Sequence, residues 1–371
     1  MASSSQSATP NMPSERSPNP CNRWQANCTV KTAASFIRIC NKTMSSKPIG
    51  PARIIALISV VVLLLYGCRR WSQGPSQRFS LTEVNNFGTN PGDLQMFKYV
   101  PSPGRSPSAL VLAIHGCAQN AQDFADHSGW PELANRMGFL LVFPQQSITN
   151  NLARCFNWFQ AKNSKRDSGE ALSIDQMVER MKADYRVDLR RIYVTGLSAG
   201  GAMTSIMLAT YPEVFAGGAI MSGVPYSCAT TLSQTFTCMQ SSVAKTPKEW
   251  GDLVRSASRA TAWPIVSIWQ GTADKVIAPV NSREELEQWT DVHGISQAPS
   301  RTDKVSGYLH QVFSASNGKA LVEVYSITDM GHGQAIDPGM APHQCGTPEA
   351  FFPNAHICAA YYACKFWGLV H

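Results

Sequence analysis

Between residues 109 and 327, short apolar runs alternate with stretches of helical spacing, and this alternation limits the folds open to the chain. Residues 109–114 and 139–143 are almost wholly apolar, as is typical of strands buried on both faces. Residues 173–185 place their apolar side chains at helical spacing instead. Strands that alternate with helices predict an α/β layer fold, with a mostly parallel central sheet flanked by helices.

The expected strands are 109–114, 139–143, 191–195, 216–221, 265–269, 305–313 and 320–327, and the expected helices are 123–137, 173–185, 199–210, 282–292 and 356–367. Asn317 and Gly318 lie between the last two strands and are typical of a hairpin turn. Residues 228–263 are rich in Thr, Ser and Gln and interrupt the alternation. They fit either a cap over a site or an ordinary surface excursion.

The motif G-L-S-A-G at residues 196–200 stands where the strand 191–195 ends and the helix 199–210 begins. Small neighbours let the backbone turn sharply, which lifts the Ser198 hydroxyl above the edge of the sheet. The N–H groups at the start of the helix then face the place where an oxyanion would develop. Ser198 is therefore the predicted nucleophile.

A serine nucleophile needs a base that is held in place by an acid. In hydrolases with a nucleophile on such a turn, the chain order is Ser, acid, His. Asp274 and His332 each follow an expected strand, at the edge where open α/β sheets place their sites. We expect Asp274 to be the acid and His332 the base. Asp329 is the rival acid, but it would approach the imidazole from its own loop.

The loop after the first buried strand, residues 115–119, should supply a second oxyanion donor. The backbone N–H groups of Cys117 and Ala199 are the predicted pair, and one such donor contributes roughly 100- to 1,000-fold in rate. We disfavour the Cys117 thiol as the nucleophile because Ser198 already has a base, an acid and a suitable turn. His115 is expected to brace this loop.

Five longer motifs resemble the poly(3-hydroxybutyrate) depolymerase family of esterases: H-G-C-A-Q-N-A-Q-D-F-A (115–125), N-W-F (157–159), Y-V-T-G-L-S-A-G-G-A-M (193–203), W-Q-G-T-A-D (269–274) and M-G-H-G (330–333). The resemblance covers roughly residues 90–370. It implies the α/β-hydrolase fold, an exported enzyme and the roles of Ser198, Asp274 and His332 given above. The family also includes feruloyl and acetylxylan esterases, so the resemblance leaves the substrate open.

These observations predict a serine esterase that works through an acyl-enzyme on hydroxybutyrate oligomers, polyester or similar short-chain esters. The alternative is a feruloyl or acetylxylan esterase that acts on plant polysaccharide. No separate polymer-binding module or long Thr-rich linker is visible, which favours soluble oligomers or small esters as substrates. A binding protein on a hydrolase scaffold is a different class, which the loss of a triad residue would favour; all three residues are present.

Trp158 and Phe159 follow the second expected strand, at the edge of the sheet where a cleft would lie. Their rings would suit the wall of a polyester or aryl-ester site, and we predict them as substrate-binding residues. Packing in the core near a disulfide is an equally good interpretation of the same two rings.

The positive charge of the chain is concentrated at its N-terminus. Residues 1–75 hold nine Lys or Arg residues and one acidic residue, Glu15, whereas the remainder holds 23 basic and 24 acidic residues. A nucleic-acid-binding protein carries its basic surface on the folded domain, so that class is disfavoured. The chain has no C-x-x-C or H-E-x-x-H pattern, and we expect neither a metal site nor a cofactor.

The run from Ile54 to Cys68 is apolar over 15 residues, which is short for a membrane span and follows Lys47 and Arg53. This pattern predicts a secretory signal peptide and an extracellular or cell-envelope location. Its last residues, L-Y-G-C, resemble a lipobox that would lipidate Cys68. A lipoprotein, soluble export and an uncleaved N-terminal anchor all stay open.

The predicted organisation has four parts. Residues 1–43 are a doubtful leader, and Met44 is the expected true start; residues 44–68 are the export signal or lipoprotein signal. Residues 69–85 are expected to form a tether, and residues 86–371 the catalytic domain.

Seven cysteines lie after Cys68, namely Cys117, Cys155, Cys228, Cys238, Cys345, Cys358 and Cys364. Export would allow disulfides to form. The pair Cys228–Cys238 is the first expectation and Cys117–Cys155 the second. Because seven is odd, at least one thiol should stay free.

Overall fold

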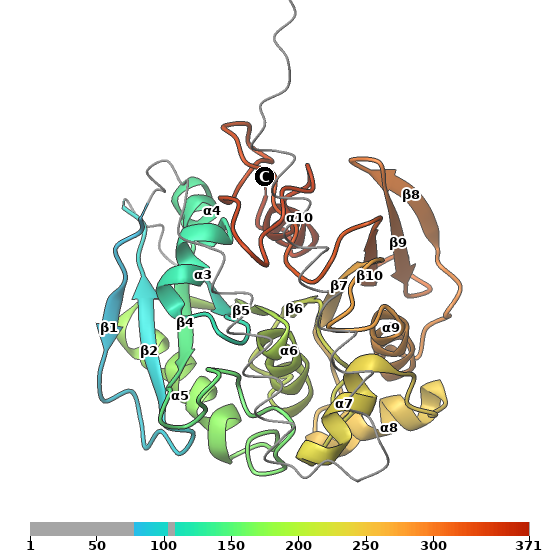
Figure 1. The fold of residues 1–371 in the computed structure, drawn as a ribbon, viewed down its shortest axis with the longest axis horizontal. Coiled ribbons are helices and arrows are strands. Elements are labelled where there is room, and N and C mark those ends of the chain that lie inside the picture. The colour runs from blue at the N-terminus through green and yellow to red at the C-terminus, as the bar shows by residue number, and fades with distance from the viewer. Residues whose placement is uncertain (1–77, 103–107, 371) are drawn as a thin grey trace, which may run out of the picture. The chain divides into compact units, whose positions relative to one another are not determined.

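The computed structural model describes residues 78–102 and 108–370, which form one α/β domain (Figure 1). The expectations for residues 1–43 and 44–68 lie outside the described residues. No helix within the described ranges is long and apolar enough to cross a membrane.

Ten strands form a single sheet in the order β1-β2-β4-β3-β5-β6-β7-β10-β9-β8. The six central strands, from β4 to β10, are parallel, and antiparallel pairs extend the sheet at both edges. The predicted mostly parallel sheet is confirmed. The strands are β1 (Thr82–Val84), β2 (Leu94–Tyr99), β3 (Ser108–Ile114), β4 (Leu140–Gln146), β5 (Val187–Leu197), β6 (Gly217–Met221), β7 (Ile265–Gly271), β8 (Arg301–Val305), β9 (Tyr308–Ser314) and β10 (Ala320–Ile327).

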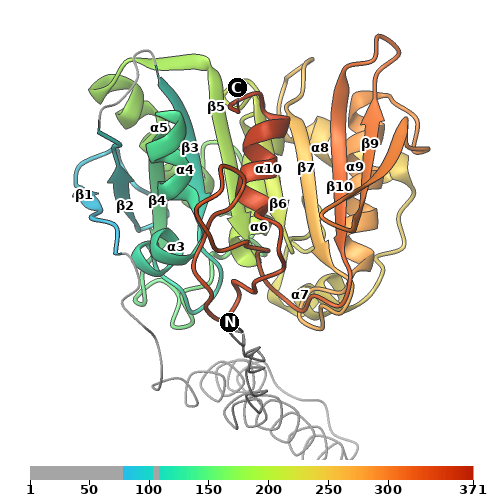
Figure 2. The same cartoon turned by 90° about the horizontal axis from the view of Figure 1, so that it is seen from above.

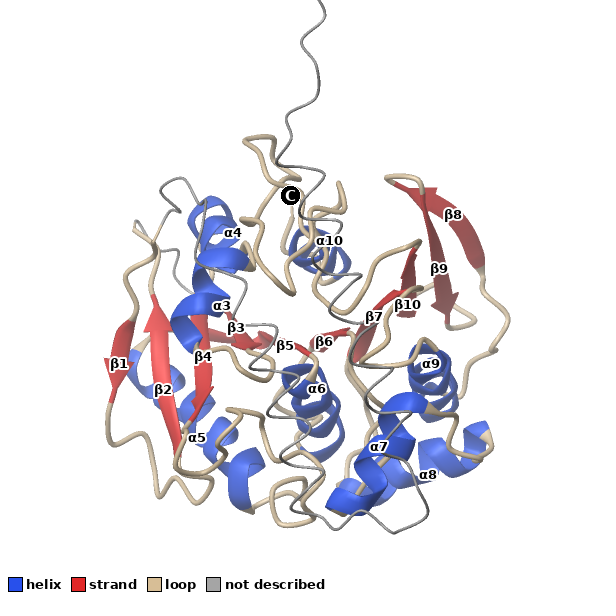
Figure 3. Cartoon of the chain, viewed as in Figure 1, coloured by secondary structure: helices blue, strands red, loops and turns tan. Residues whose placement is uncertain are grey.

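Helices cover both faces of the sheet (Figures 1 and 3). They are α3 (Ala121–His127), α4 (Trp130–Met137), α5 (Gly169–Asp184), α6 (Ala199–Thr210), α7 (Leu232–Gln240), α8 (Pro247–Ala257), α9 (Val280–His293) and α10 (Ala359–Phe366). Side chains of α5, α6, α8 and α9 share one core with the sheet, and those of α3, α4 and α10 share the other. Figure 2 shows α4 and α10 lying over the strands on the second face. The central strand β3 is buried along its whole length because both cores close over it.

The predicted tether 69–85 is wrong at its C-terminal end. Phe79 is buried, and its N–H donates to the Asp126 carboxylate at 2.8 Å. Residues 82–84 form the edge strand β1, with Val84 turned into the core. The folded domain therefore begins before residue 86, because these apolar side chains are buried in it.

Two expected elements are divided in the structure. The helix expected at 123–137 is two helices, because Gly129 between them has a left-handed φ of 83° and Pro131 stands in the first turn of α4. The strand expected at 305–313 is likewise interrupted by a turn at Ser306 and Gly307, both with positive φ. The predicted hairpin at Asn317–Gly318 is confirmed, since it joins β9 to β10.

The interrupting stretch 228–263 contains α7 and α8. Trp250 of α8 is fully buried in the same core as α6 and α9, so this helix belongs to the layer that covers the sheet. Helix α7 is mostly exposed and carries Phe236, whose side chain is 73% exposed. It is tied to its own loop by the disulfide Cys228–Cys238, which confirms the first expected pair.

A buried histidine links the last strands of the sheet. The two ring nitrogens of His310 on β9 lie 2.8 Å from Asp303 Oδ1 on β8 and 2.9 Å from Glu323 Oε2 on β10. The second oxygen of Glu323 accepts from Ser267 on β7 at 2.6 Å. Burial alone would lower the pKa of His310, but the hydrogen bonds to the two carboxylates outweigh it and raise that pKa. The cluster therefore favours an imidazolium that joins four strands.

We predict that His310→Gln destabilises the domain and that the loss depends on pH. Removing one partner of a buried ion pair costs about 3 kcal/mol or more in the free energy of unfolding. Since the folded-state pKa is raised, this stability is fully present below the unfolded pKa of about 6.5 and is lost as the pH rises through the folded pKa. Urea denaturation at pH 6 and pH 9 measures both effects.

The matched control is His343→Gln, which changes an exposed histidine and should shift stability by less than about 0.5 kcal/mol. An equal loss for His310→Gln at both pH values would contradict the charged cluster.

Candidate active site

Ser198 stands on a sharp turn between β5 and α6. Its backbone has φ 59° and ψ −117°, a strained conformation for a residue with a side chain. The neighbouring strand helps to hold the turn, because the Ser198 N–H donates to the Met221 carbonyl at the end of β6 at 2.9 Å. Ser198 keeps part of its surface exposed while its neighbours on both sides are buried. The predicted strand, turn and helix around this serine are confirmed as local structure.

Glycines let the segments around this turn approach each other closely. A Cβ on Gly200 would collide with the carbonyl oxygen of Ile114 at the end of β3. A Cβ on Gly116 would lie 3.4 Å from Ser198 Cβ and 3.2 Å from the Leu197 carbonyl oxygen. The loop after β3 is therefore packed directly against the serine turn.

Asp274 and His332 meet at the carboxyl ends of β7 and β10. His332 Nδ1 lies 2.8 Å from Asp274 Oδ2, and the Asp274 side chain is fully buried. A Cβ on Gly271 would strike the carbonyl oxygens of Met330 and Gly331, so glycine at this position lets the histidine loop approach β7. The rival acid Asp329 is exposed on its own turn. Of the two carboxylates, the structure joins Asp274 to the histidine.

The Asp274 carboxylate accepts further hydrogen bonds besides that from His332. The backbone N–H groups of Val276 and Ile277 donate to Oδ1 at 2.8 and 2.9 Å, and Gln270 Nε2 donates to Oδ2 at 3.1 Å. Burial alone would raise the pKa of Asp274, but the hydrogen bonds, led by that from His332, hold it below the usual range. The carboxylate is therefore kept ionised beside the imidazole. Gln270 was missed as a site residue, although it lies inside the motif W-Q-G-T-A-D.

Two hydrogen bonds connect the serine turn, by way of the end of β6, to the loop that carries His332. Ser222 follows Met221, the residue that accepts from Ser198 N–H, and its hydroxyl donates to the carbonyl of Gly333 at 3.3 Å. Among the described residues, no direct hydrogen bond joins the Ser198 and His332 side chains. In ligand-free active sites such bonds are often long and shorten only when substrate is bound.

The predicted oxyanion loop is fastened to the chain after β4. Cys117 forms a disulfide with Cys155, which confirms the second expected pair, and the Ala118 N–H donates to the Ala153 carbonyl at 2.7 Å. Within residues 78–102 and 108–370, the Cys117 N–H has no hydrogen-bond acceptor. Ala199 is the first residue of α6, where backbone N–H groups have no partner inside the helix.

His115 braces this loop, as expected. The Gln146 N–H donates to its Nε2 at 3.0 Å, so Nδ1 carries the proton and donates to the Gly116 carbonyl at 2.7 Å. Burial lowers the pKa of His115 to about 4, which keeps the ring neutral and this pair of bonds intact at ordinary pH. The ring is therefore a fixed support between β4 and the loop.

The two predicted substrate-binding aromatics pack against each other with ring centroids 5.6 Å apart. Trp158 is buried in the core that α5, α6, α8 and α9 share with the sheet, and Phe159 packs partly exposed against that core. A different ring contacts the histidine: the Phe351 and His332 ring centroids are 6.0 Å apart, edge to face. No sequence motif pointed to Phe351, which reaches the site from the long segment before α10.

A third disulfide, Cys345–Cys358, closes that segment. Among the described cysteines, Cys364 is the one without a disulfide partner, and it is buried. The expectation of at least one free thiol is confirmed. In the described part of the chain, no group of three or more His, Cys, Asp or Glu side chains could hold a metal ion.

A serine on a strand-to-helix turn and an Asp–His pair, at the carboxyl edge of this sheet, define an α/β-hydrolase. Residues 96–305 match the family model described as Esterase PHB depolymerase. The chain therefore belongs to the poly(3-hydroxybutyrate) depolymerase family of esterases, and it is a serine carboxylic ester hydrolase.

Similar proteins agree with this class. The chain is 49% identical over 297 residues to poly(3-hydroxyalkanoate) depolymerase C of Paucimonas lemoignei, covering 80% of this chain and 72% of that protein. It is 34% identical over 263 residues to feruloyl esterase B of Talaromyces stipitatus, covering 68% and 72% respectively. Its structure resembles that of an acetyl xylan esterase from Aspergillus awamori with a TM-score of 0.66 and 25% identity, covering 79% of this chain and all of that one.

We predict that Gln270→Met lowers kcat for p-nitrophenyl acetate about tenfold with little change in KM. The variant removes one hydrogen bond to the ionised Asp274 carboxylate, and such bonds contribute about 1.5–3 kcal/mol. Steady-state kinetics at pH 8 measure the loss. The control is Gln311→Met on β9, which should keep the wild-type kcat. An unchanged kcat in Gln270→Met would contradict a role for Gln270 in positioning the predicted acid, Asp274.

Proposed function

We propose that Ser198, His332 and Asp274 are the nucleophile, the general base and the orienting acid of this esterase. The observation that carries the proposal is the 2.8 Å hydrogen bond between His332 Nδ1 and Asp274, which leaves the other ring nitrogen available for a proton. Ser198 Oγ attacks the ester carbonyl carbon while His332 takes its proton. The N–H groups of Cys117 and Ala199 stabilise the oxyanion that forms.

The remaining steps use the proton that His332 has taken from Ser198. His332 passes it to the leaving alcohol oxygen as the C–O bond breaks, which leaves the acyl group on Ser198. Water then attacks the acyl-enzyme with His332 again as base, and the acid product departs. The low pKa of Asp274 supports this sequence, because an ionised carboxylate stabilises the imidazolium that forms twice in each cycle.

The proposed substrates are short hydroxyalkanoate esters, including hydroxybutyrate oligomers and polyester. The 49% identity to a poly(3-hydroxyalkanoate) depolymerase supports this choice. Feruloyl or acetylxylan ester hydrolysis on plant polysaccharide is the second candidate, favoured by the likeness to an acetyl xylan esterase over the whole of that chain. Phe159 and Phe351 would line the cleft, whereas the burial of Trp158 favours a supporting role.

We also propose that the enzyme works outside the cytoplasm. Three disulfides among the described residues support export to an oxidising compartment. Attachment to a membrane through the N-terminal segment or a lipidated Cys68 is a further expectation of the sequence.

We predict that Ser198→Ala and His332→Ala each lose activity by roughly 10⁶-fold, as in other serine triads. The measurement is turnover of hydroxybutyrate oligomers, amorphous polymer, methyl ferulate and p-nitrophenyl acetate by the wild type and both variants. Fastest turnover of hydroxybutyrate esters supports the first candidate, and preference for ferulate supports the second. Wild-type-like turnover in either variant contradicts the mechanism.

A second prediction concerns the cysteines. Peptide mapping of the exported enzyme without reduction should find the linkages Cys117–Cys155, Cys228–Cys238 and Cys345–Cys358, with Cys364 alkylated only after denaturation. Burial raises the pKa of the Cys364 thiol, which further suppresses its reaction in the folded state. Free Cys117 in the exported protein would argue against an oxidising compartment.

A further inference from the structure

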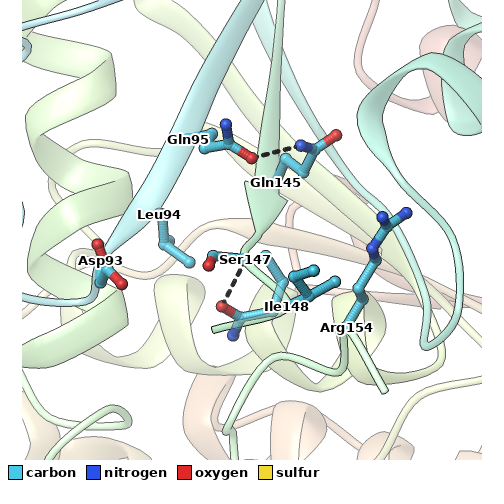
Figure 4. Close-up of a pocket in the computed structure, with 8 residues that line it drawn as sticks. Asp93, Leu94, Gln95, Gln145, Ser147, Ile148 and Arg154 are labelled. Atoms are coloured by element: carbon cyan, nitrogen blue, oxygen red, sulfur yellow. Dashed lines mark hydrogen bonds between the residues drawn. The ribbon is translucent and has the colours of Figure 1, made fainter. Parts of the chain in front are cut away.

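A polar pocket of about 370 Å³ lies at the end of β4 (Figure 4). The N–H of Gln146, one of its lining residues, donates to the ring of His115 in the proposed oxyanion loop. Its lining comes from the start of β2, the end of β4 and the loop that follows β4. Six of its eight lining residues are polar or charged; the lining residues are Asp93, Leu94, Gln95, Gln145, Gln146, Ser147, Ile148 and Arg154. None of these residues has a part in the mechanism above.

Arg154 is the unusual member of this lining. Its side chain is half-buried, yet among the described residues it has no salt-bridge or hydrogen-bond acceptor for its guanidinium. An Arg presents five donors in a planar fork that matches a carboxylate. Asp93, the acidic residue of the lining, lies on the opposite side of the pocket in Figure 4. Burial raises the pKa of Asp123, which lies outside the lining, and the charge of Arg154 opposes that rise, but among the described residues no hydrogen bond joins the two side chains. The Arg154 side of the pocket therefore offers unused donors to a ligand.

The position of Arg154 is fixed relative to the proposed oxyanion loop. It precedes Cys155, which forms a disulfide with Cys117. The Cα atoms of Cys117 and Cys155 are 4.2 Å apart. The hydrogen bond from Ala118 to Ala153 fastens the same segment on the other side of Arg154. The backbone at Arg154 is thus fastened to the loop whose Gly116 packs against the Ser198 turn.

The sheet gives the spacing between β4, which lines the pocket together with β2, and β5, which leads to the nucleophile. These two strands have β3 between them in the order β4-β3-β5. Neighbouring strands are about 4.8 Å apart, so the ends of β4 and β5 are separated by about 10 Å across the sheet. One hydroxybutyrate unit adds four chain atoms, or about 5 Å when extended. The separation therefore matches about two units.

We propose that this pocket is a subsite for the free carboxylate end of a short hydroxyalkanoate oligomer, with Arg154 as its specificity-determining residue. The inference rests on the proposed function and adds a preference for soluble acid-ended oligomers. In such an oligomer the carboxylate belongs to the alcohol side of each ester bond. Ser198 would therefore attack the carbonyl about two units from the end, and the departing alkoxide, protonated by His332, would leave as a hydroxy-acid dimer.

The test compares a hydroxybutyrate trimer as the free acid and as its methyl ester, at pH 8 and low salt. The readout is the ratio of the two kcat/KM values in each enzyme. We expect the wild type to prefer the acid by about tenfold or more, as suits a charge-assisted hydrogen bond. Arg154→Gln should bring the ratio close to one, and Arg154→Lys should lie between them. Added salt should lower the wild-type ratio.

The matched control is Arg259→Gln, which removes an exposed positive charge after α8 and should keep the wild-type ratio. A wild-type ratio of one or less, or an undiminished preference in Arg154→Gln, would overturn the subsite.

A binding measurement tests the subsite independently of the proposed catalytic function. Calorimetry with the free-acid trimer on Ser198→Ala needs no turnover, and adding Arg154→Gln to that variant should weaken binding about tenfold. Equal binding by the two would overturn the subsite even when Ser198-dependent hydrolysis of p-nitrophenyl acetate stands. Loss of binding with Arg154→Gln would support the subsite even if the proposed catalytic roles failed.

Discussion

The strained backbone of Ser198 is the constraint on which the rest of the site depends. A residue with φ 59° and ψ −117° persists only where its surroundings over-determine it. Here the turn is held by the hydrogen bond to Met221 and by the close approach of Gly200 to the end of β3. The same close packing sets Gly116, which precedes Cys117, against the Ser198 turn. One backbone turn thus sets both the exposure of the hydroxyl and the approach of the loop that carries the Cys117 N–H, one of the two proposed oxyanion donors.

The other parts of the site are fixed by separate, local supports. The disulfide Cys117–Cys155 and the neutral His115 ring hold the proposed oxyanion loop to the chain around the end of β4. Gln270 and two backbone N–H groups donate to the Asp274 carboxylate and hold it beside the His332 ring. These supports lie on different strands, so the sheet itself keeps their spacing. Catalysis of this kind depends on groups that are already in place before charge develops.

Much of this arrangement could be predicted from the sequence, because it depends on local patterns. The turn at Ser198, the Asp274 and His332 positions after strands, and the disulfide Cys228–Cys238 follow from short motifs or a short spacing. The pair Cys117–Cys155 is 38 residues apart and was the second expectation. What could not be predicted depends on contacts between distant segments. Phe351 reaches His332 from a long irregular segment, and Arg154 lines its pocket only because β2 pairs with β4. The break at Gly129 was missed because the apolar residues keep helical spacing across it, whereas the helical backbone conformation stops at Gly129.

The most direct test of the central claim is the site of reaction with a fluorophosphonate. An alkyl fluorophosphonate should inactivate the enzyme with one adduct per chain, and mass mapping should place that adduct on Ser198. His332→Ala should react far more slowly, because it lacks the proposed base that would activate the hydroxyl. Full activity after complete labelling, or an adduct on another residue, would contradict the assignment of Ser198 as the nucleophile.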